Sequence, residues 1–157
     1  MMSQKARIFK DFNIFEKIMR TRDPAHQKRL GKEVAGFDPD VWDREKVQVV
    51  LQGNYAKFTQ NPEMCGELLA TGDKMLAEAS PYDMEWGIGM EADHPNVERH
   101  ENWPGRNLLG KILMYVRNKI RWEDPELARR PDVQKAMAAF ALEYRQGASR
   151  PQSSRLI

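Results

Sequence analysis

The chain has 157 residues, of which 41% are hydrophobic and 31% are charged, and its formal net charge is +2. This length and composition predict one globular domain with a sizeable core, and the small net charge argues against a nucleic-acid binder held mainly by electrostatics. A single cysteine, Cys65, excludes an internal disulfide, and no apolar run approaches the roughly 20 residues that span a bilayer. We therefore expect a cytoplasmic protein without a membrane segment.

Capping signals mark the helix starts in the first half of the chain. Asp11, Asp23-Pro24 and Asp38-Pro39 each place a carboxylate before a segment with helical apolar spacing. The longest predicted helix begins at Asp38-Pro39 and ends at Asn61-Pro62, because the residue before a proline disfavours the helical conformation. A short helix over residues 63–71 follows and ends at a glycine.

The second half is predicted to contain the only strands. Residues 74–79 and 86–90 are expected to be short strands, and residues 91–104 a polar loop of a length that is often functional. Asn107 is expected to open a strongly amphipathic helix, and residues 131–146 to form a last one. The predicted fold is therefore a mainly α domain of the α+β class with a few short strands. It spans residues 1–146 as a single domain, and the tail 147–157 is expected to be disordered.

One stretch, residues 79–110, has neither helical nor strand periodicity. It alternates aromatic, glycine and carboxylate residues, with Asp83 just before Trp86 and two glycines, Gly87 and Gly89, just after it. Glycines permit close approach of the backbone to a ligand, and an indole offers a flat surface for stacking. A ligand pocket and an ordered surface loop closed by glycines explain this pattern about equally well.

Several common sites are absent from the sequence. His94 and His100 lie in an acidic loop at a spacing that matches no zinc motif. The chain has no phosphate-binding loop, no dinucleotide fingerprint and no serine-hydrolase elbow. We therefore expect neither a metal nor a cofactor.

Two lysines are candidate nucleophiles, and two asparagines are candidate ligands of a substrate. Lys57 lies between Tyr55 and Phe58, and a lysine desolvated beside aromatic rings becomes partly neutral and nucleophilic. Lys5 is the second candidate, and for both the simpler interpretation is a surface lysine with its stem on an apolar face. Asn61 and Asn107 each fit a helix-end cap or a hydrogen-bonding residue in a pocket.

Seven segments, in this order and at these spacings, resemble the NADAR family, also called YbiA-like. The resemblance covers roughly residues 1–120. The segments are Gln4-Lys5-Ala6, the segment around Trp42, Ala56-Lys57-Phe58-Thr59-Gln60-Asn61, Leu68-Leu69-Ala70-Thr71-Gly72, Glu78-Ala79-Ser80-Pro81 with Asp83, Trp86-Gly87-Ile88-Gly89, and Trp103-Pro104-Gly105-Arg106-Asn107-Leu108-Leu109-Gly110.

The resemblance implies a mainly helical α+β domain and N-glycosidase activity on N-ribosides. Known activities of the family cleave phosphoribosylamino-pyrimidine intermediates of riboflavin synthesis, or remove ADP-ribose from modified guanine in nucleic acid. The implied partner is a small-molecule N-riboside or an ADP-ribosylated nucleotide, free or in nucleic acid. The candidate catalytic residues are Lys5, Asp83 and Lys57. The candidate substrate-binding residues are Trp42, Asn61, Trp86, Gly87, Gly89 and Asn107.

The chain departs from the family at its start. The family carries a Glu-His-Tyr/Trp segment with a functional glutamate just ahead of the position of Met1, and this sequence does not contain it. A start codon assigned too late, a truncated chain and a natural member that binds without cleaving all explain the departure, and a lost N-terminal segment is favoured. The alternative function is a catalytically impaired module that binds ADP-ribose or nucleotides. A structural or host-interaction protein that works through its C-terminal helix is a third hypothesis.

Overall fold

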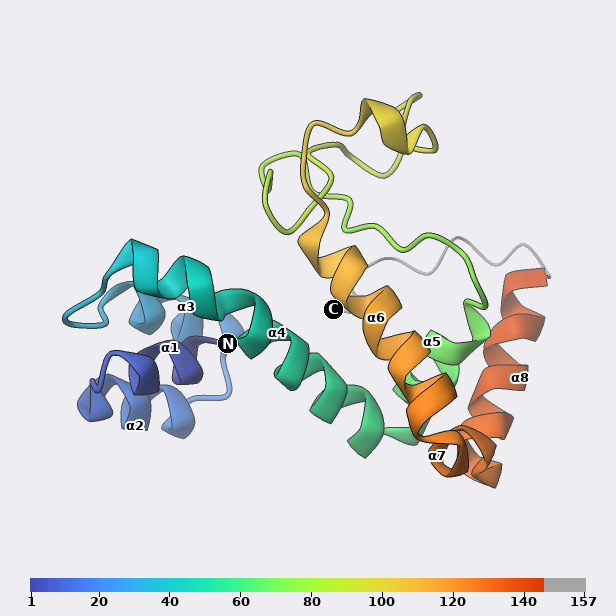
Figure 1. Ribbon diagram of the computed structural model, residues 1–157, viewed down its shortest axis with the longest axis horizontal. Coiled ribbons are helices and arrows are strands. Elements are labelled where there is room, and N and C mark those ends of the chain that lie inside the picture. Colours follow the sequence, from blue (N-terminus) through green and yellow to red (C-terminus); the bar gives the residue numbers. More distant parts are fainter. Residues whose placement is uncertain (146–157) are drawn as a thin grey trace. The chain divides into compact units, whose positions relative to one another are not determined.

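The fold is built from helices and loops (Figure 1). The computed structural model describes residues 1–145 and is 65% helix. The elements are α1 (Met2–Ile8), α2 (Phe12–Arg20), α3 (Pro24–Lys32), α4 (Pro39–Gln60), α5 (Pro62–Ala70), the 3-10 helix η1 (His100–Asn102), α6 (Leu108–Glu123), α7 (Pro125–Arg129) and α8 (Pro131–Arg145).

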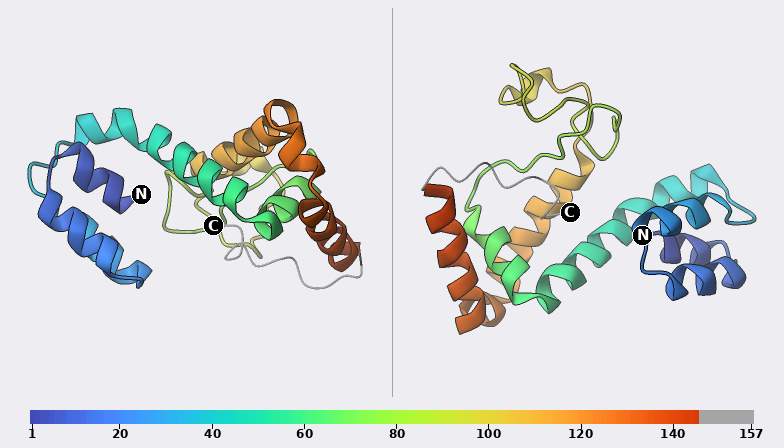
Figure 2. Two further views of the ribbon diagram at one scale, coloured as in Figure 1. Left: turned by 90° about the horizontal axis from the view of Figure 1, so that it is seen from below. Right: turned by 180° about the vertical axis from the view of Figure 1, so that it is seen from behind.

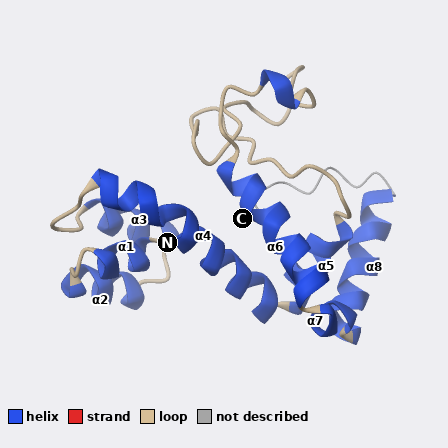
Figure 3. Ribbon diagram, in the orientation of Figure 1, coloured by secondary structure: helices blue, strands red, loops and turns tan. Residues whose placement is uncertain are grey.

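The prediction of a few short strands is wrong. Within residues 1–145 there is no strand and no sheet, although the mainly helical character is confirmed. Residues 74–79 and 86–90, predicted as strands, belong to the long loop between α5 and α6, which contains only the turn of η1 and is coloured tan in Figure 3.

The chain divides into two compact units, where the sequence predicts a single domain over residues 1–146. The first unit is Met1–Gly53 and the second begins at Asn54, so α4 contributes residues to both. The last helix, predicted over residues 131–146, is α8. The predicted tail over 147–157 lies outside the described residues.

In the first unit, α1, α2 and α3 pack together around a small apolar core (Figure 1). The core residues are Ala6, Ile14, Ile18, Leu30 and Val34. Asp11 joins two parts of this unit, because its carboxylate accepts hydrogen bonds from the N–H groups of Ile14 at the start of α2 and of Ala35 after α3, at 3.0 and 2.9 Å. The hydrogen bond from Ala35, followed by that from Ile14, lowers the pKa of the Asp11 carboxyl.

In the second unit, α5 and α8 lie side by side, as the views in Figures 1 and 2 agree. Gly66 allows this contact, since an ideal Cβ at that position would lie 2.6 Å from atoms of Val133, Ala136 and Met137 on α8. Cys65 is completely buried, and burial raises the pKa of its thiol to about 11. It is therefore an unreactive core residue.

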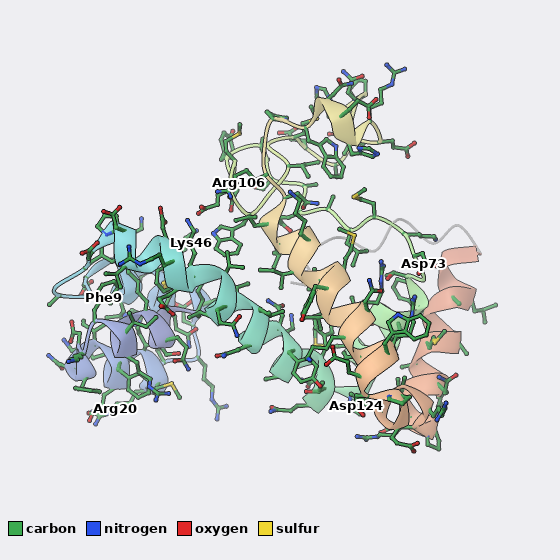
Figure 4. All side chains as sticks on the ribbon, in the orientation of Figure 1. Phe9, Arg20, Lys46, Asp73, Arg106 and Asp124 are labelled. Atoms are coloured by element: carbon green, nitrogen blue, oxygen red, sulfur yellow. The ribbon has the colours of Figure 1, made fainter. Side chains whose placement is uncertain are left out.

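A buried arginine ties α6 to the end of α5. Arg117 is only 3% exposed, and its guanidinium donates hydrogen bonds to the Thr71 hydroxyl at 2.7 Å and to the Lys74 carbonyl at 2.9 Å. One turn later, Arg121 donates to the carboxylate of Asp73 at 2.7 Å; Asp73 is labelled in Figure 4. These bonds hold the first residues of the long loop against α6.

We expect Gly66→Ala to lower the free energy of unfolding by about 1–3 kcal/mol, because the added methyl group overpacks the α5–α8 contact. Gly53→Ala is the matched control, since no atom beyond the backbone of its own helix lies within 4 Å of the ideal Cβ of Gly53. The control should stabilise the chain by up to about 1 kcal/mol through helix propensity alone. Urea denaturation followed by circular dichroism measures both changes, and equal shifts for the two variants would contradict the close packing of α5 on α8.

Candidate functional site

The long loop between α5 and α6 returns to cap the start of α6. Carbonyl groups of residues 84–88 accept hydrogen bonds from the N–H groups of residues 105–109. The five bonds are Gly105 to Ile88 at 2.9 Å, Arg106 to Met84 at 2.8 Å, Asn107 to Gly87 at 2.9 Å, Leu108 to Glu85 at 3.1 Å and Leu109 to Trp86 at 3.1 Å. N–H groups in the first turn of a helix have no partner within the helix, so the loop satisfies donors that α6 leaves open.

This bonding pattern explains why residues 86–90 are not a strand. In a strand pair the acceptor position moves steadily along one chain as the donor moves along the other. Here the acceptors of residues 105–109 occur in the order 88, 84, 87, 85, 86. Residues 84–88 therefore wrap around the N-terminal start of α6 and do not run alongside a second strand.

Asn107 fastens a second part of the loop to the same helix start. Its side chain is 2% exposed, its Oδ1 accepts from the Glu78 N–H at 3.2 Å, and its Nδ2 donates to the Leu76 carbonyl at 2.8 Å. The residue has a left-handed backbone with φ 51°, a conformation that asparagine tolerates better than most residues. Both ends of the amide are occupied by the protein, and the predicted role of Asn107 in substrate binding stays a prediction.

Asp83 makes a tight turn that positions Trp86. Its Oδ1 accepts hydrogen bonds from the Trp86 N–H at 2.7 Å and the Glu85 N–H at 3.1 Å, and no hydrogen bond from residues 1–145 reaches its Oδ2. Both side chains are half-buried. The turn therefore holds a carboxylate and an indole three residues apart, with one carboxylate oxygen left for a ligand.

The glycines of this loop are required by close contacts. An ideal Cβ at Gly87 would lie 2.8 Å from the Asp83 carbonyl oxygen and 3.0 Å from that of Glu78, and Gly89 has φ 71°. The main chains of Glu78, Asp83 and Gly87 thus meet at one point, which leaves no room for a side chain at position 87. A preorganised loop of this kind favours binding with little loss of entropy.

An open hollow of ≈ 620 Å³ adjoins this turn. Pro81 and Gly89 contribute to its wall on the side of the turn, and Glu91, Asp93 and His94 provide its charged or titratable lining. Its other lining residues are Met90, Pro95 and Pro104. Asp83 and Trp86 do not line the hollow, which shares only the flanking residues Pro81 and Gly89 with this part of the loop.

Glu78 is a carboxylate that the sequence did not single out. Its Oε2 is buried and has no hydrogen-bond partner, and burial, followed by the negative charge of Asp83, raises the pKa of the Glu78 carboxyl. The residue lies five positions before Asp83 in a segment that carries the family resemblance, and this was the available signal. Its burial depends on Asn107 and the return of the loop, which no local pattern reveals.

Both candidate lysines have a pKa lowered by burial. The Lys5 ammonium donates to the Gly31 carbonyl at 2.8 Å and lies 3.8 Å from the centroid of the Phe37 ring. The Lys57 ammonium lies 5.6 Å from the centroid of Phe58. Each amine is therefore neutral more often than a lysine in water, as a nucleophilic role requires.

The structure brings some of the predicted site residues together. Asp83, Trp86, Gly87, Gly89 and Asn107 share the loop and the start of α6. Lys57 and Asn61 lie where α4 meets α5, and the Asn61 side-chain amide donates to the Lys57 carbonyl.

Lys5 and Trp42 belong to the first unit, on α1 and α4. Among the described residues there is no group of three or more His, Cys, Asp or Glu residues that could hold a metal ion. No helix in the same part of the chain is long and apolar enough to cross a membrane.

Comparison with known proteins identifies the family. Residues 1–121 match the model of the NADAR domain. The chain is 44% identical over 119 residues to N-glycosidase R617 of Acanthamoeba polyphaga mimivirus, an alignment that covers 76% of this chain and 70% of that protein. It is 39% identical over 112 residues to N-glycosidase Npun_R5314 of Nostoc punctiforme, covering 71% of this chain and 65% of that protein.

A third relative is longer than this chain. The riboflavin biosynthesis protein VVA0006 of Vibrio vulnificus is 35% identical over 121 residues, which cover 77% of this chain and 30% of that protein. The match to the NADAR domain runs through both compact units and most of the chain. The chain belongs to the NADAR family, as the ordered segments of the sequence indicate.

We expect Asn107→Ala to lower the free energy of unfolding by about 2–3 kcal/mol, because it removes two hydrogen bonds of about 1 kcal/mol each and strains a left-handed backbone. Asn107→Gly should lose about 1 kcal/mol less, since glycine adopts positive φ without strain. In both variants the Glu78 amide should exchange its hydrogen faster in NMR exchange experiments. Unchanged exchange at Glu78 would show that Asn107 does not anchor the loop.

Proposed function

We propose that this chain hydrolyses the bond between C1′ of a ribose and the nitrogen of a base. The mimivirus and Nostoc relatives are named N-glycosidases, and the turn around Asp83 supports the same chemistry. The observation that carries the proposal is the Asp83 carboxylate, which two backbone N–H groups orient through Oδ1 beside Trp86. The substrate is a small-molecule glycosylated base.

The geometry of Asp83 suits the demands of the reaction. Cleavage of a C1′–N bond passes through a state with positive charge on the ribose ring. A carboxylate already held in place stabilises that charge without reorganising in the transition state. In the proposed complex Asp83 Oδ2 faces C1′, Trp86 stacks on the base, and the glycine backbone at positions 87 and 89 approaches the ribose.

The lining of the hollow bears on the choice of substrate. Glu91 and Asp93 place negative charge beside the turn, and this charge repels the phosphates of a nucleic acid more than a single ribose phosphate. We therefore favour a free N-riboside, such as a phosphoribosylamino-pyrimidine of the riboflavin pathway, over ADP-ribosylated guanine within nucleic acid. A module that binds ADP-ribose without cleaving it is the alternative.

A lysine is proposed to take part through its neutral amine. The lysine Nζ attacks C1′ and the base leaves with the bonding electron pair, taking up the proton that the amine loses. The C1′–O4′ bond then opens, with a proton passing from the nitrogen to O4′, and water hydrolyses the resulting imine. The lowered pKa of Lys5 and of Lys57 supports this role for both, and the family resemblance favours Lys5. Direct attack by water on C1′ is the competing route.

Asp83→Asn should lower kcat for base release by about 10²–10³-fold, the usual effect of removing one preorganised electrostatic group. The asparagine keeps an oxygen for the Glu85 and Trp86 N–H groups, so the turn should persist. Chromatographic detection of the released base from a phosphoribosylamino-pyrimidine, and in parallel from ADP-ribosylated guanosine, measures the rate.

Asp40→Asn is the matched control, because Asp40 is exposed in the first turn of α4, and it should leave the rate unchanged. Release of base from neither substrate by the unmodified chain would contradict the proposed function. Tight binding of ADP-ribose without base release, measured by calorimetry, would favour the alternative module.

Borohydride should trap the imine if a lysine attacks C1′. Reduction during turnover is expected to add the mass of the ribose phosphate to the peptide that contains Lys5, as measured by mass spectrometry. Lys5→Arg should abolish this adduct, and Lys57→Arg should retain it. Normal turnover without any adduct would instead favour direct attack by water.

A further inference from the structure

The main chain of Glu78 is held from several sides, whereas its side chain has a buried atom without a partner. The Glu78 N–H donates to Asn107 Oδ1 at 3.2 Å, and its carbonyl accepts from Ile88 at 2.9 Å and from Ser80 at 3.1 Å. The side-chain Oε2 is buried with no hydrogen-bond partner. Buried polar atoms in native proteins nearly always have a partner, so this carboxyl calls for an explanation beyond folding.

The surroundings of Glu78 disfavour its charged form. Burial is the larger cause of its raised pKa, and the negative charge of Asp83 is the second. Burial and Asp83 both act in this direction, and the nearby cation Arg106, labelled in Figure 4, has its Nη1 3.8 Å from Oε1 of Glu85. Glu78 therefore keeps its proton to a higher pH than an exposed glutamate does.

Asp83 and Glu78 differ in their hydrogen bonding. Asp83 Oδ1 accepts two backbone hydrogen bonds, whereas Glu78 Oε2 accepts none. Their main chains meet around Gly87, where an ideal Cβ would lie within 3.0 Å of the carbonyl oxygens of both residues. Two neighbouring carboxyl groups in contrasting environments commonly divide the acid and charge-stabilising roles between them.

We propose that Glu78 is the general acid of this site and protonates the leaving base, an inference that rests on the proposed N-glycosidase function. The C1′–N bond breaks, its electron pair goes to the base nitrogen, and the Glu78 carboxyl proton is transferred to that nitrogen. Asp83 stabilises the positive charge that remains on the ribose. Water then adds to C1′, directly or after capture by a lysine, and gives up a proton that restores the Glu78 acid.

The assignment also defines the class of base. A general acid accelerates the departure of a poor leaving group, such as the nitrogen of an amino-pyrimidine, which leaves readily only when it is protonated. The rate at which a base departs without taking up a proton is raised little by a general acid. The site therefore suits amino-linked N-ribosides better than pyridinium ribosides, whose base leaves as a neutral molecule.

The test compares Glu78→Gln with the unmodified chain on a phosphoribosylamino-pyrimidine and on nicotinamide mononucleotide, whose base needs no proton. On the first substrate kcat should fall by about 10²–10⁴-fold, the usual contribution of a general acid. On the second it should fall by less than about tenfold, because no proton transfer is lost. Glu63→Gln, an exposed change on α5, is the matched control and should leave both rates unchanged.

The pH profile provides a readout that a purely structural role would not move. The rate of the unmodified chain on the amino-pyrimidine should decline as pH rises through the raised pKa of Glu78, and Glu78→Gln should lose that decline. If the chain does not turn over nicotinamide mononucleotide, this pH profile alone tests whether Glu78 is the general acid. An unchanged profile in the variant would overturn the inference.

Stability gives a second readout, independent of activity. A carboxyl whose pKa is raised by folding stabilises the folded state at acid pH, relative to neutral pH, and this contribution is lost as pH rises through the folded pKa. Glu78→Gln should therefore unfold at an equal or higher urea concentration than the unmodified chain at pH 7, with the difference shrinking toward pH 4. A variant that is less stable at pH 7 would assign Glu78 a structural role.

The outcomes separate the inference from the function on which it rests. If the unmodified chain releases base and Glu78→Gln releases it equally fast, the inference fails and the proposed function stands. If the unmodified chain releases no base from either substrate, the proposed function fails, and the role of Glu78 fails with it.

Discussion

The structure of the candidate site depends on the hydrogen bonds that join the carbonyl groups of residues 84–88 to the N–H groups of residues 105–109. The start of α6 carries N–H groups that need partners, and the loop carries carbonyl groups without a sheet to accept them. Joining the two fixes the path of the loop between α5 and α6, which apart from η1 has no regular structure of its own. Asn107 adds two more hydrogen bonds between the loop and the start of α6, because its side-chain amide bonds to the main chain of Leu76 and Glu78.

This arrangement has a consequence for ligand binding. N–H groups at a helix start often bind a phosphate or another anion, yet at α6 those of Asn107, Leu108 and Leu109 are already occupied by the loop. In the proposed complex, recognition therefore depends on what the loop presents: the Asp83 carboxylate, the Trp86 indole and the glycine backbone. The same connection buries one oxygen of Glu78 next to Asp83, so the scaffold that shapes the site also creates its two contrasting acids.

Local sequence signals predicted the helices well and the loop poorly. Asp11 and Asp23-Pro24 start α2 and α3 as expected, with each aspartate side chain accepting a backbone N–H. These signals work because a cap acts within a few residues of itself. Residues 74–79 and 86–90 were predicted as strands because short apolar runs do not reveal which partner will take their hydrogen bonds. For both segments the partner is the start of α6, which follows Trp86 by about twenty residues and lies 29 and 31 residues from Glu78 and Leu76.

The candidate site residues also divide into those that local sequence predicts and those that it does not. Asp83, Trp86, Gly87 and Gly89 could be selected from the sequence because aromatic, acidic and glycine residues alternate there without a structural period. Glu78 could not be selected from residue types, because what distinguishes it is the burial of its Oε2 in a loop that Asn107, 29 residues later, holds in place. The ordered family segments supplied what residue types alone leave open, and the match to the NADAR domain over residues 1–121 confirms the family.

The central claim is that the turn around Asp83 and Trp86 is a preformed site for a ribose-linked base. An NMR titration of the ¹⁵N-labelled Asp83→Asn full chain, in which turnover should be slow, with a phosphoribosylamino-pyrimidine tests it most directly, because every backbone amide reports on its own surroundings. The account predicts that the largest shift changes fall on the amides of Trp86, Gly87 and Gly89 and on the Trp86 indole N–H. Shift changes confined to the helices, with residues 78–89 unaffected at saturation, would contradict it.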